Sequence, residues 1–588
     1  MTLPRPKPAI PLPIGHKQAL VRLLQAGRIA DARQQAETLA RLHPQDGFCA
    51  NVLGLAAQME GDTQRALDHF ARAVALAPEV ADFGANLGYA LNRSLRHQAA
   101  EAALRRVLRH HPRHVNARTN LVQALVELKR PEEAVRHALA LIRHMGETPE
   151  ALRVLGVAQA QAGDDRRGRH TLERALAGDP PRFEEYALLA RCIENEDGPE
   201  AAIRRLRDIV FNHPEAAFAQ MELGNRLAQS GDLEAAETAY RAALAANPSL
   251  AHAFLGLGRL RPWCANDPLL PALKALARNT GQRPDHRADA LFALAKALED
   301  IGDHDAGFEA TMQANGLLRG LVNYDCDANI KGMSELPNVK FRPLARQHAT
   351  APQAAPRPIF ILALPRSGTT LLEHILARHP DVTALGEDDT VHLHAIRAME
   401  TGNLATLARA ARSHHARMAR GRPVVTDKFL ENGLCVPALA EALPDARFVY
   451  IRKDARAAGY SLLRSPLPPK GHPYTMDQVE VARYVAAHHR LMQVWMGRYA
   501  DRFTEVVYEN LVETPQTQIP ALLERLELPP CADCLAPEQG KRPVKTLSLA
   551  QVRRGISTRY RDRWQAHAEA LAPMCARLAA EGAPVRPR

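Results

Sequence analysis

The segment PIFILALPRSGTTLLEHILARHP, residues 358–380, decides the fold of the second half of the chain. Ile359 to Leu364 is a short, continuous apolar run, which is typical of a buried parallel strand. Pro365 to Thr370 reads as a turn of small and hydroxyl residues, and Leu371 to Arg378 has helical spacing. A strand, a loop and a helix N-terminus in this order present free backbone N–H groups and the positive end of the helix dipole. The segment therefore predicts an anion-binding loop.

The side chains of this loop add donors for an anion. Arg366 can pair with an anion through two N–H groups, and Ser367, Thr369 and Thr370 contribute hydroxyls on either side of Gly368. A nucleotide triphosphatase loop would read GxxxxGK[ST], whereas this loop has no Gly-Lys pair. The lysine that neutralises β- and γ-phosphates is missing, and no magnesium site is implied. The loop suits one phosphate plus one further anionic group, which disfavours a nucleotide kinase or hydrolase.

PRSGTT after a strand resembles the loop with which sulfotransferases hold the 5'-phosphosulfate of 3'-phosphoadenylyl sulfate. It is most similar to tyrosylprotein sulfotransferases and to bacterial proteins that join tetratricopeptide repeats to such a domain. The resemblance extends over about residues 357–580, so we expect a P-loop-like α/β sulfotransferase domain with a parallel sheet at 357–588. It implies sulfuryl transfer to a hydroxyl, 3'-phosphoadenylyl sulfate as the co-substrate and no metal. Arg366 and the loop would hold the phosphosulfate.

An acidic stretch, HPDVTALGEDDT, follows the loop at residues 379–390. The resemblance places the catalytic carboxylate here and favours Glu387 as the general base, with Asp388 as the second candidate. A positioned carboxylate can remove the proton of an acceptor hydroxyl as the new S–O bond forms. His392 and His394 are alternative bases, since other sulfotransferases use histidine. A solvated acidic loop without a catalytic role is the remaining interpretation.

A second strand is expected at Val424 to Thr426 in VVTDKFLENG, with Lys428 near its carboxyl end. Open α/β sheets bind ligands at that edge. The resemblance puts Lys428 near the bridging oxygen between sulfate and phosphate, where a lysine stabilises the charge of the leaving group. Alternatively, Lys428 only pairs with Asp427.

A third strand is expected at Arg447 to Ile451 in ARFVYIRKDARAAGYSLLR. In the family that it resembles, an arginine before an aspartate and a serine eight residues later grip the 3'-phosphate. Counting back from Ser461 gives Lys453 in the place of that arginine. Arg452 is one residue out of register and would point to the opposite side of the strand.

Two further matches extend the resemblance toward the adenosine. VVYENLVETP, residues 506–515, is similar to a strand whose tyrosine, here Tyr508, lines the nucleotide pocket. TLSLAQVRRGISTRYRDRW, residues 546–564, is similar to a C-terminal loop that closes over the nucleotide. It implies nucleotide contacts from Ser548, Gln551 and Arg563. Residues 541–563 hold eight Lys/Arg and one acidic residue, which fits a lid on a doubly anionic nucleotide.

The first half of the chain is a repeat with a period of 34 residues. Prolines recur at that spacing, with glycine at position 146 in the place of one of them: Pro44, Pro78, Pro112, Pro180, Pro214 and Pro248. A column of mostly small residues keeps the same register, including Gly54, Gly88, Gly156 and Gly224. Small residues allow two helices to approach, and proline ends the second helix, so each period predicts a helical hairpin.

These columns resemble the tetratricopeptide repeat. The resemblance implies an α-helical superhelix at residues 16–320, including capping helices near its end, and a Pro/Ala-rich linker at 321–356. Such an array binds rather than catalyses, and we expect its groove to recruit a protein or peptide acceptor. The other interpretation is a spacer or oligomerisation arm, which would make the protein a homo-oligomer.

Composition limits the partners and the compartment. Lys and Arg exceed Asp and Glu by 11 in 588 residues, an excess too small to indicate a nucleic-acid partner. No stretch approaches the ~20 apolar residues of a membrane helix, and eight scattered cysteines do not form a disulfide framework. We expect a cytoplasmic protein that does not bind membranes. The non-enzymatic alternative is a repeat scaffold with a vestigial nucleotide-binding domain.

Overall fold

The computed structural model describes residues 12–178, 185–341, 356–540 and 555–585. The chain divides into two compact units: Met1–Leu257 with Pro268–Ala290, and Gly258–Asp267 with Leu291–Arg588. The part of the chain that the structure describes contains no helix long and apolar enough to cross a membrane.

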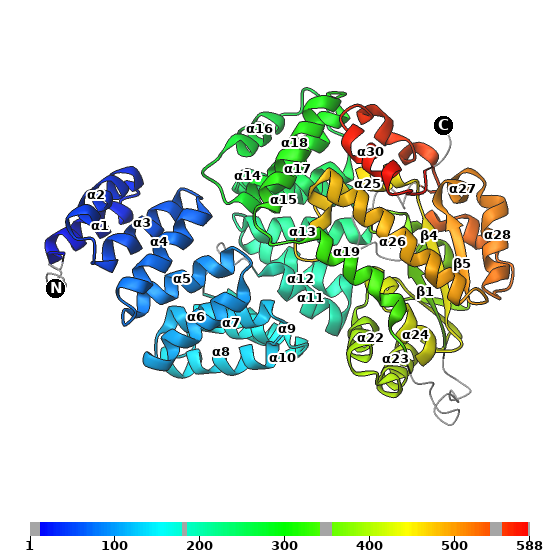
Figure 1. The fold of residues 1–588 in the computed structure, drawn as a ribbon, viewed down its shortest axis with the longest axis horizontal. Coiled ribbons are helices and arrows are strands. Elements are labelled where there is room, and N and C mark those ends of the chain that lie inside the picture. The colour runs from blue at the N-terminus through cyan, green and yellow to red at the C-terminus, as the bar shows by residue number, and fades with distance from the viewer. Residues whose placement is uncertain (1–11, 179–184, 342–355, 541–554, 586–588) are drawn as a thin grey trace, which may run out of the picture. The chain divides into compact units, whose positions relative to one another are not determined.

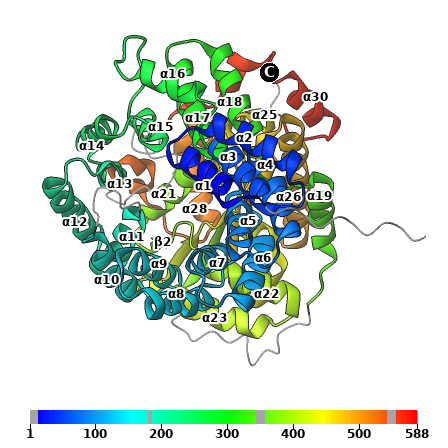
Figure 2. The same cartoon turned by 90° about the vertical axis from the view of Figure 1, so that its left-hand side faces the viewer.

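The first unit is built from antiparallel helical hairpins, as the 34-residue period predicts (Figure 1). Its helices are α1 (Ile14–Gln25), α2 (Ile29–Leu42), α3 (Gly47–Met59), α4 (Thr63–Leu76), α5 (Ala81–Arg93), α6 (His97–His110), α7 (Val115–Glu127), α8 (Pro131–Met145), α9 (Pro149–Gln161), α10 (Asp165–Leu176), α11 (Tyr186–Asp197), α12 (Pro199–Asn212), α13 (Ala217–Ser230), α14 (Leu233–Ala246) and α16 (Leu270–Arg278). The helix α15 (Ala251–Leu260) begins in this unit and ends in the second one, because the division falls after Leu257. Consecutive hairpins such as α9–α10 and α11–α12 lie side by side (Figure 2).

The small-residue column lies where the two helices of a hairpin meet. A Cβ atom on Gly54 would lie 2.6 Å from the ring of Phe70, and one on Gly88 would lie 2.4 Å from Leu104. A larger residue at either position would push the second helix away. The periodic glycines thus follow from close helix packing rather than from turns.

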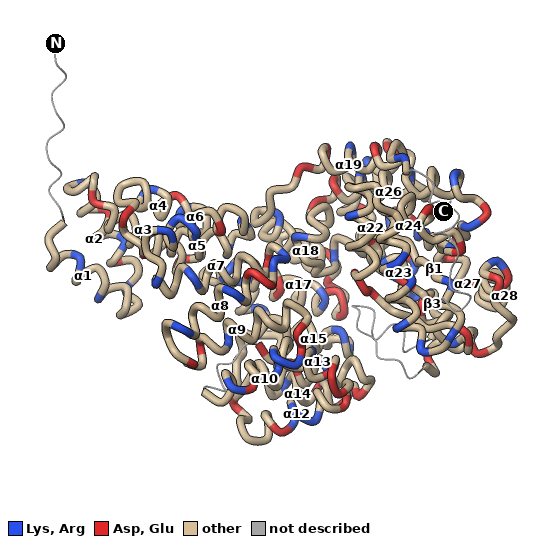
Figure 3. The backbone as a smooth tube through the Cα atoms, turned by 90° about the horizontal axis from the view of Figure 1, so that it is seen from below, with Lys and Arg blue, Asp and Glu red and all other residues tan. Residues whose placement is uncertain are grey.

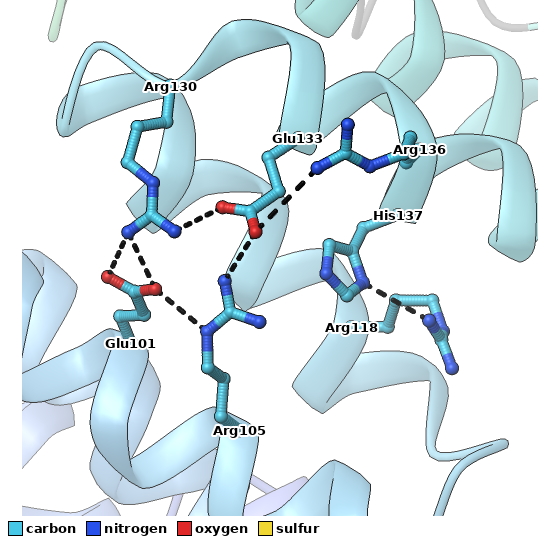
Figure 4. A network of polar contacts seen from close by, with 7 residues as sticks. All are labelled: Glu101, Arg105, Arg118, Arg130, Glu133, Arg136 and His137. Carbon is cyan, nitrogen blue, oxygen red and sulfur yellow. Dashed lines mark hydrogen bonds and ion pairs between the residues drawn. The ribbon is translucent and has the colours of Figure 1, made fainter.

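Neighbouring hairpins are also joined by charged side chains, which Figure 4 shows between α6 and α8. Arg130 Nη1 donates to both carboxylate oxygens of Glu101 at 2.8 and 2.9 Å. Arg105 contacts Glu101 at 2.8 Å and Glu133 at 3.1 Å. Basic and acidic positions are interspersed along the helices (Figure 3), and partly exposed ion pairs of this kind add only modest stability.

The second unit contains a five-stranded parallel sheet with the order β2-β3-β1-β4-β5. Its strands are β1 (Arg357–Leu362), β2 (Val382–Ala384), β3 (Val424–Asp427), β4 (Arg447–Arg452) and β5 (Phe503–Val507). In the registers, Arg357 of β1 pairs with Val424 of β3, and Ile359 of β1 with Arg447 of β4. The central position of β1 confirms the prediction of a buried parallel strand.

Helices connect and cover these strands, as expected for an α/β domain. They are α21 (Thr369–Ala377), α22 (Thr390–Thr401), α23 (Leu404–Met418), α24 (Val436–Ala442), α25 (Ala455–Leu463), α26 (Gln478–Arg498), α27 (Tyr508–Glu513), α28 (Pro515–Arg525) and α30 (Ala572–Ala580).

Alternate residues of each central strand enter two different cores. Phe360 and Phe448 pack with residues of α22–α24 and with Trp495 of α26. Ile359 and Val449 pack on the opposite face, with residues of α21 and α28. This two-residue alternation explains why β1 and β4 read as continuous apolar runs, because both faces of the sheet are buried.

The hairpin of α17 (Pro284–Asp300) and α18 (His304–Arg319), which the sequence assigns to capping helices of the array, lies mostly in the second compact unit. Phe308 of α18 packs into a core with residues of α25, α26 and α30. Asn315 Nδ2 donates to Leu463 O at 2.9 Å, and Arg319 pairs with Glu480 at 2.9 Å. The division between the two compact units falls inside α17, after Ala290.

The expected linker at 321–356 also contains ordered elements. A helix, α19 (Cys326–Glu335), and a 3-10 turn at Leu336–Asn338 lie within it, and α19 packs against α26. Residues 342–355, which carry the Pro/Ala-rich part, lie outside the described residues.

Candidate active site

The residues singled out in the sequence follow the carboxyl ends of the five strands. Arg366 follows β1, Glu387 follows β2, Lys428 follows β3, Lys453 follows β4 and Tyr508 follows β5. All neighbouring strands are parallel, so these carboxyl ends lie at one edge of the sheet. This is the edge at which open α/β sheets bind ligands.

The β1–α21 loop has the geometry that the sequence predicts. Gly368 adopts a left-handed conformation, with φ of 97°, immediately before α21. A Cβ atom there would lie 2.4 Å from Tyr508 Cδ2, so the tyrosine ring lies directly against the loop backbone. Arg366 also has a positive φ, of 66°, and the loop hydroxyls are buried: Ser367, Thr369 and Thr370. The N–H groups at the start of α21 are thereby directed into a tight cradle.

Cations gather beside this loop. Lys453 is 8% exposed, its Nζ lies 3.2 Å from Ser461 Oγ, and it lies 5.2 Å above the Tyr508 ring. Burial, together with repulsion from Arg366, lowers the pKa of Lys453 to about 8. Burial and repulsion from Arg464 lower the pKa of Arg366 to about 10. Buried like charges held this close favour an anion between them, which fits a phosphate-bearing ligand.

Arg452 is turned away from that cluster. Its Nε donates to Glu505 Oε1 of β5 at 2.8 Å. The structure therefore brings Lys453, and not Arg452, together with Ser461, in agreement with the eight-residue spacing.

A carboxylate and a lysine meet at the ends of β2 and β3. Lys428 Nζ donates to Glu387 Oε1 at 2.6 Å; the lysine side chain is 1% exposed, whereas that of Glu387 is 51% exposed. Glu373 of α21 holds the Glu387 loop by accepting from Gly386 N at 2.9 Å. A buried cation thus orients a carboxylate that remains half exposed.

Lys428 does not pair with Asp427, which was the alternative interpretation. Asp427 Oδ1 accepts instead from Phe429 N at 3.1 Å and from Asn432 Nδ2 at 2.9 Å. These bonds fix the chain as it leaves β3, and they leave Glu387 as the carboxylate that contacts Lys428.

The other candidate bases lie in different surroundings. Asp388 accepts from Thr390 N at 2.9 Å and lies 3.2 Å from His414. Burial alone would raise the pKa of Asp388, but these two partners outweigh it and lower the pKa. His392 is buried against Phe429, with ring centroids 4.6 Å apart, and burial lowers its pKa. His394 is partly buried on α22.

The predicted adenosine contacts are placed only in part. Tyr508 is the first residue of α27 rather than part of a strand, because β5 ends one residue earlier. Arg563 opens a 3-10 turn at Arg563–His567, and the next residue, Trp564, lies under Arg456 at 4.4 Å. Ser548 and Gln551, with most of the expected lid, lie outside the described residues.

Several polar residues near the site were not expected. Burial lowers the pKa of His472, while the nearby carboxylates Glu431 and Glu387 act against that shift. Arg464 pairs with Glu299 of α17, which also accepts from Tyr460 Oη at 2.7 Å. The sequence gives no signal that His472, a lone histidine in a loop, or Glu299 of α17 would lie close to these residues.

Fold and site together define the class: a helical-repeat protein with an α/β domain whose sheet edge carries a tight strand–loop–helix turn and buried cations beside it. Matches to family models identify the families of the two parts of the chain. The sulfotransferase family model matches residues 358–533, and tetratricopeptide repeat models match 20–82, 91–158 and 194–251. The chain contains tetratricopeptide repeats followed by a sulfotransferase-family domain.

Its curated relatives are distant. An uncharacterized protein of Aquifex aeolicus is 28% identical over 421 residues, covering 67% of this chain and 54% of that protein. A putative protein-tyrosine sulfotransferase of Caenorhabditis briggsae is 24% identical, covering 29% of this chain and 65% of that protein. Protein-tyrosine sulfotransferase 1 of Danio rerio is 26% identical, covering 37% and 71%. The chain spans about half the length of the Aquifex relative.

Proposed function

We propose that this protein transfers a sulfuryl group from 3'-phosphoadenylyl sulfate to a hydroxyl acceptor. The observation that carries the proposal is the contact between Lys428 Nζ and Glu387 Oε1, at 2.6 Å, on the sheet edge that also carries the β1–α21 loop. It combines an anion cradle, a buried cation and an accessible carboxylate, which are the groups that sulfuryl transfer needs.

Each group has one task in this reaction. Arg366 and the loop N–H groups hold the 5'-phosphosulfate. The acceptor oxygen bonds to sulfur while the bond from sulfur to the phosphate oxygen breaks, and Glu387 takes the acceptor's proton. Lys428 stabilises the negative charge that grows on the departing phosphate. The products are the sulfated acceptor and adenosine 3',5'-bisphosphate.

The cluster of Lys453 and Ser461 supports recognition of the 3'-phosphate. The lysine provides a buried positive charge, and the serine, 3.2 Å away, provides a second donor. Losing a charge-assisted hydrogen bond costs on the order of 1.5–3 kcal/mol, which is roughly ten- to a hundredfold in affinity. We therefore expect adenosine 3',5'-bisphosphate to bind that much more tightly than adenosine 5'-phosphate.

Isothermal titration calorimetry with the two nucleotides tests the donor assignment. A Lys453→Gln variant should reduce the difference between the two affinities. The matched control is Arg452→Gln, which removes only the contact of Arg452 with Glu505 of β5. Equal affinities of the unaltered protein for both nucleotides would remove the basis for this donor. Binding of neither nucleotide would favour the alternative of a scaffold with a vestigial domain.

The acceptor is proposed to be a protein or peptide, with a tyrosine hydroxyl as the first candidate. Tetratricopeptide repeats typically bind extended segments of other proteins, and two of the relatives are named as protein-tyrosine sulfotransferases. The repeats would then raise the concentration of the acceptor near Glu387 without touching the nucleotide.

A further inference from the structure

Two adjacent histidines of α23 each contact an aspartate that is the sequence neighbour of a candidate catalytic residue. His414 Nε2 lies 3.2 Å from Asp388 Oδ2, and Asp388 follows Glu387. His415 Nε2 lies 3.8 Å from Asp427 Oδ2, and Asp427 precedes Lys428. One helical turn therefore lies behind both chain segments that bring the carboxylate and the lysine together.

The contact of His414 has a defined direction. Arg417 Nη2 lies 3.1 Å from His414 Nδ1, and a guanidinium can only donate. His414 Nδ1 is therefore the acceptor, so the proton of the neutral ring lies on Nε2, which lies 3.2 Å from Asp388 Oδ2 at ion-pair distance, without the geometry of a hydrogen bond. Asp388 Oδ1 in turn accepts from Thr390 N at 2.9 Å. The resulting chain of contacts runs from α23 into the Glu387 loop.

Burial separates these histidines from the reaction itself. His414 is 6% exposed and His415 is 1% exposed, whereas the Glu387 side chain is half exposed. In the described segments of the chain, no group of three or more His, Cys, Asp and Glu residues is arranged to hold a metal ion. The two histidines are thus too buried to act as the general base, and they do not form part of a metal site in the described segments.

We propose that His414 is a positioning residue: through Asp388 it fixes the Gly386–Asp389 loop so that Glu387 stays at Lys428. This inference rests on the proposed function, because it assigns the loop's rigidity to sulfuryl transfer. Displacing a reacting group by about 1 Å can cost about a hundredfold in rate, so a loose loop would lower kcat while the nucleotide still binds.

Two substitutions of similar size test the direction of the contact. His414→Gln keeps an N–H donor at the reach of Nε2, whereas His414→Asn reaches only as far as Nδ1. With a tyrosine-containing peptide and 3'-phosphoadenylyl sulfate, we expect the glutamine variant to retain kcat within about fivefold. The asparagine variant should lose at least tenfold in kcat, with less than a twofold change in the Kd of adenosine 3',5'-bisphosphate. Ser413→Ala, at an exposed neighbour on α23, is the control for helix packing.

The outcomes separate this inference from the function on which it rests. If the unaltered protein transfers no sulfuryl group to any hydroxyl acceptor, the proposed function fails and the inference fails with it. If it does transfer, equal kcat values for the glutamine and asparagine variants overturn the positioning role alone. A loss of nucleotide binding in the asparagine variant, matching its loss of kcat, would also overturn it, since the effect would then be general misfolding.

The tautomer can be measured without turnover. Nitrogen chemical shifts of the imidazole, assigned by comparison with His414→Gln, should show the proton on Nε2. A proton on Nδ1 would contradict the contact with Asp388 and would overturn the proposal.

Discussion

Lys453 is the side chain whose titration gives the proposed nucleotide site a measurable signature. Burial and the neighbouring Arg366 lower its pKa to about 8 in the free protein, and a bound phosphate would raise it again. Binding therefore requires protonated Lys453, which dominates below pH 8 and becomes scarce above it. The affinity for the bisphosphate should be full below pH 8 and should fall as the pH rises.

The expected change follows from the protonated fraction. At pH 9 about a tenth of the free protein carries a protonated Lys453, so the Kd of adenosine 3',5'-bisphosphate should be about tenfold weaker than at pH 7. The nucleotide's own phosphates are ionised throughout this range. Calorimetry at both pH values measures this, with Lys453→Arg as the control, since arginine keeps its charge. A Kd in the unaltered protein that does not change with pH would show that Lys453 does not contact the ligand.

Sequence reasoning worked at this scale where spacing constrained the geometry. The step of eight positions from Lys453 to Ser461 places both beside the same loop, and Arg452 turns outward as strand alternation requires. The contact of Glu387 with Lys428, by contrast, joins residues 41 positions apart. The contacts of His414 with Asp388 and of Glu299 with Arg464 depend on which helix packs against which segment. No local pattern in a single sequence indicates this packing.

At the scale of elements, α17 and α18 show how one pattern can serve two environments. An amphipathic hairpin has the same periodicity whether it packs on another repeat or on the sheet domain, so the sequence assigned both helices to the repeats. The short helix α19 lies within the expected linker, where the sequence lacks the 34-residue periodicity by which the other helices were predicted. The strands β1 and β4 were predictable because both of their faces are buried, which gives a continuous apolar run.

The placement of α18 predicts where the second unit can be cut. A fragment of residues 320–588 lacks Phe308, which packs in the core beside α25, and the pair of Arg319 with Glu480. A fragment of residues 258–588 keeps both. Removing a buried phenylalanine costs about 3–5 kcal/mol, so the shorter fragment should be less stable by at least that amount.

Urea denaturation of the two fragments, followed by circular dichroism, measures the difference. Coincident unfolding curves would mean that α17 and α18 belong to the repeats after all. A shorter fragment that is unfolded without urea would agree with the role assigned to the hairpin.

For the whole molecule, the central question is what the repeats add to the sheet domain. Every residue with a proposed chemical role lies in the second compact unit. If the repeats dock the acceptor, the fragment of residues 258–588 should bind nucleotide as the full chain does but show a much higher KM for a protein acceptor. A small phenol, which has no peptide segment for the repeats to bind, should have the same KM with both.

An oligomerisation arm gives a different result. Loss of the repeats would then change the molar mass measured by light scattering and leave the acceptor KM unchanged. Steady-state kinetics and light scattering on the same two samples distinguish these roles.

Transfer of a radiolabelled sulfuryl group from 3'-phosphoadenylyl sulfate is the most direct test of the whole account. The full chain is incubated with the labelled donor and with tyrosine-containing peptides, small phenols or a cell lysate. We expect label to appear on a hydroxyl acceptor, with Glu387→Gln lowering the rate by a factor on the order of 10² to 10⁴ while nucleotide affinity is retained. A Glu387→Gln variant that transfers label at the normal rate, or an unaltered protein that labels no acceptor, would contradict the account.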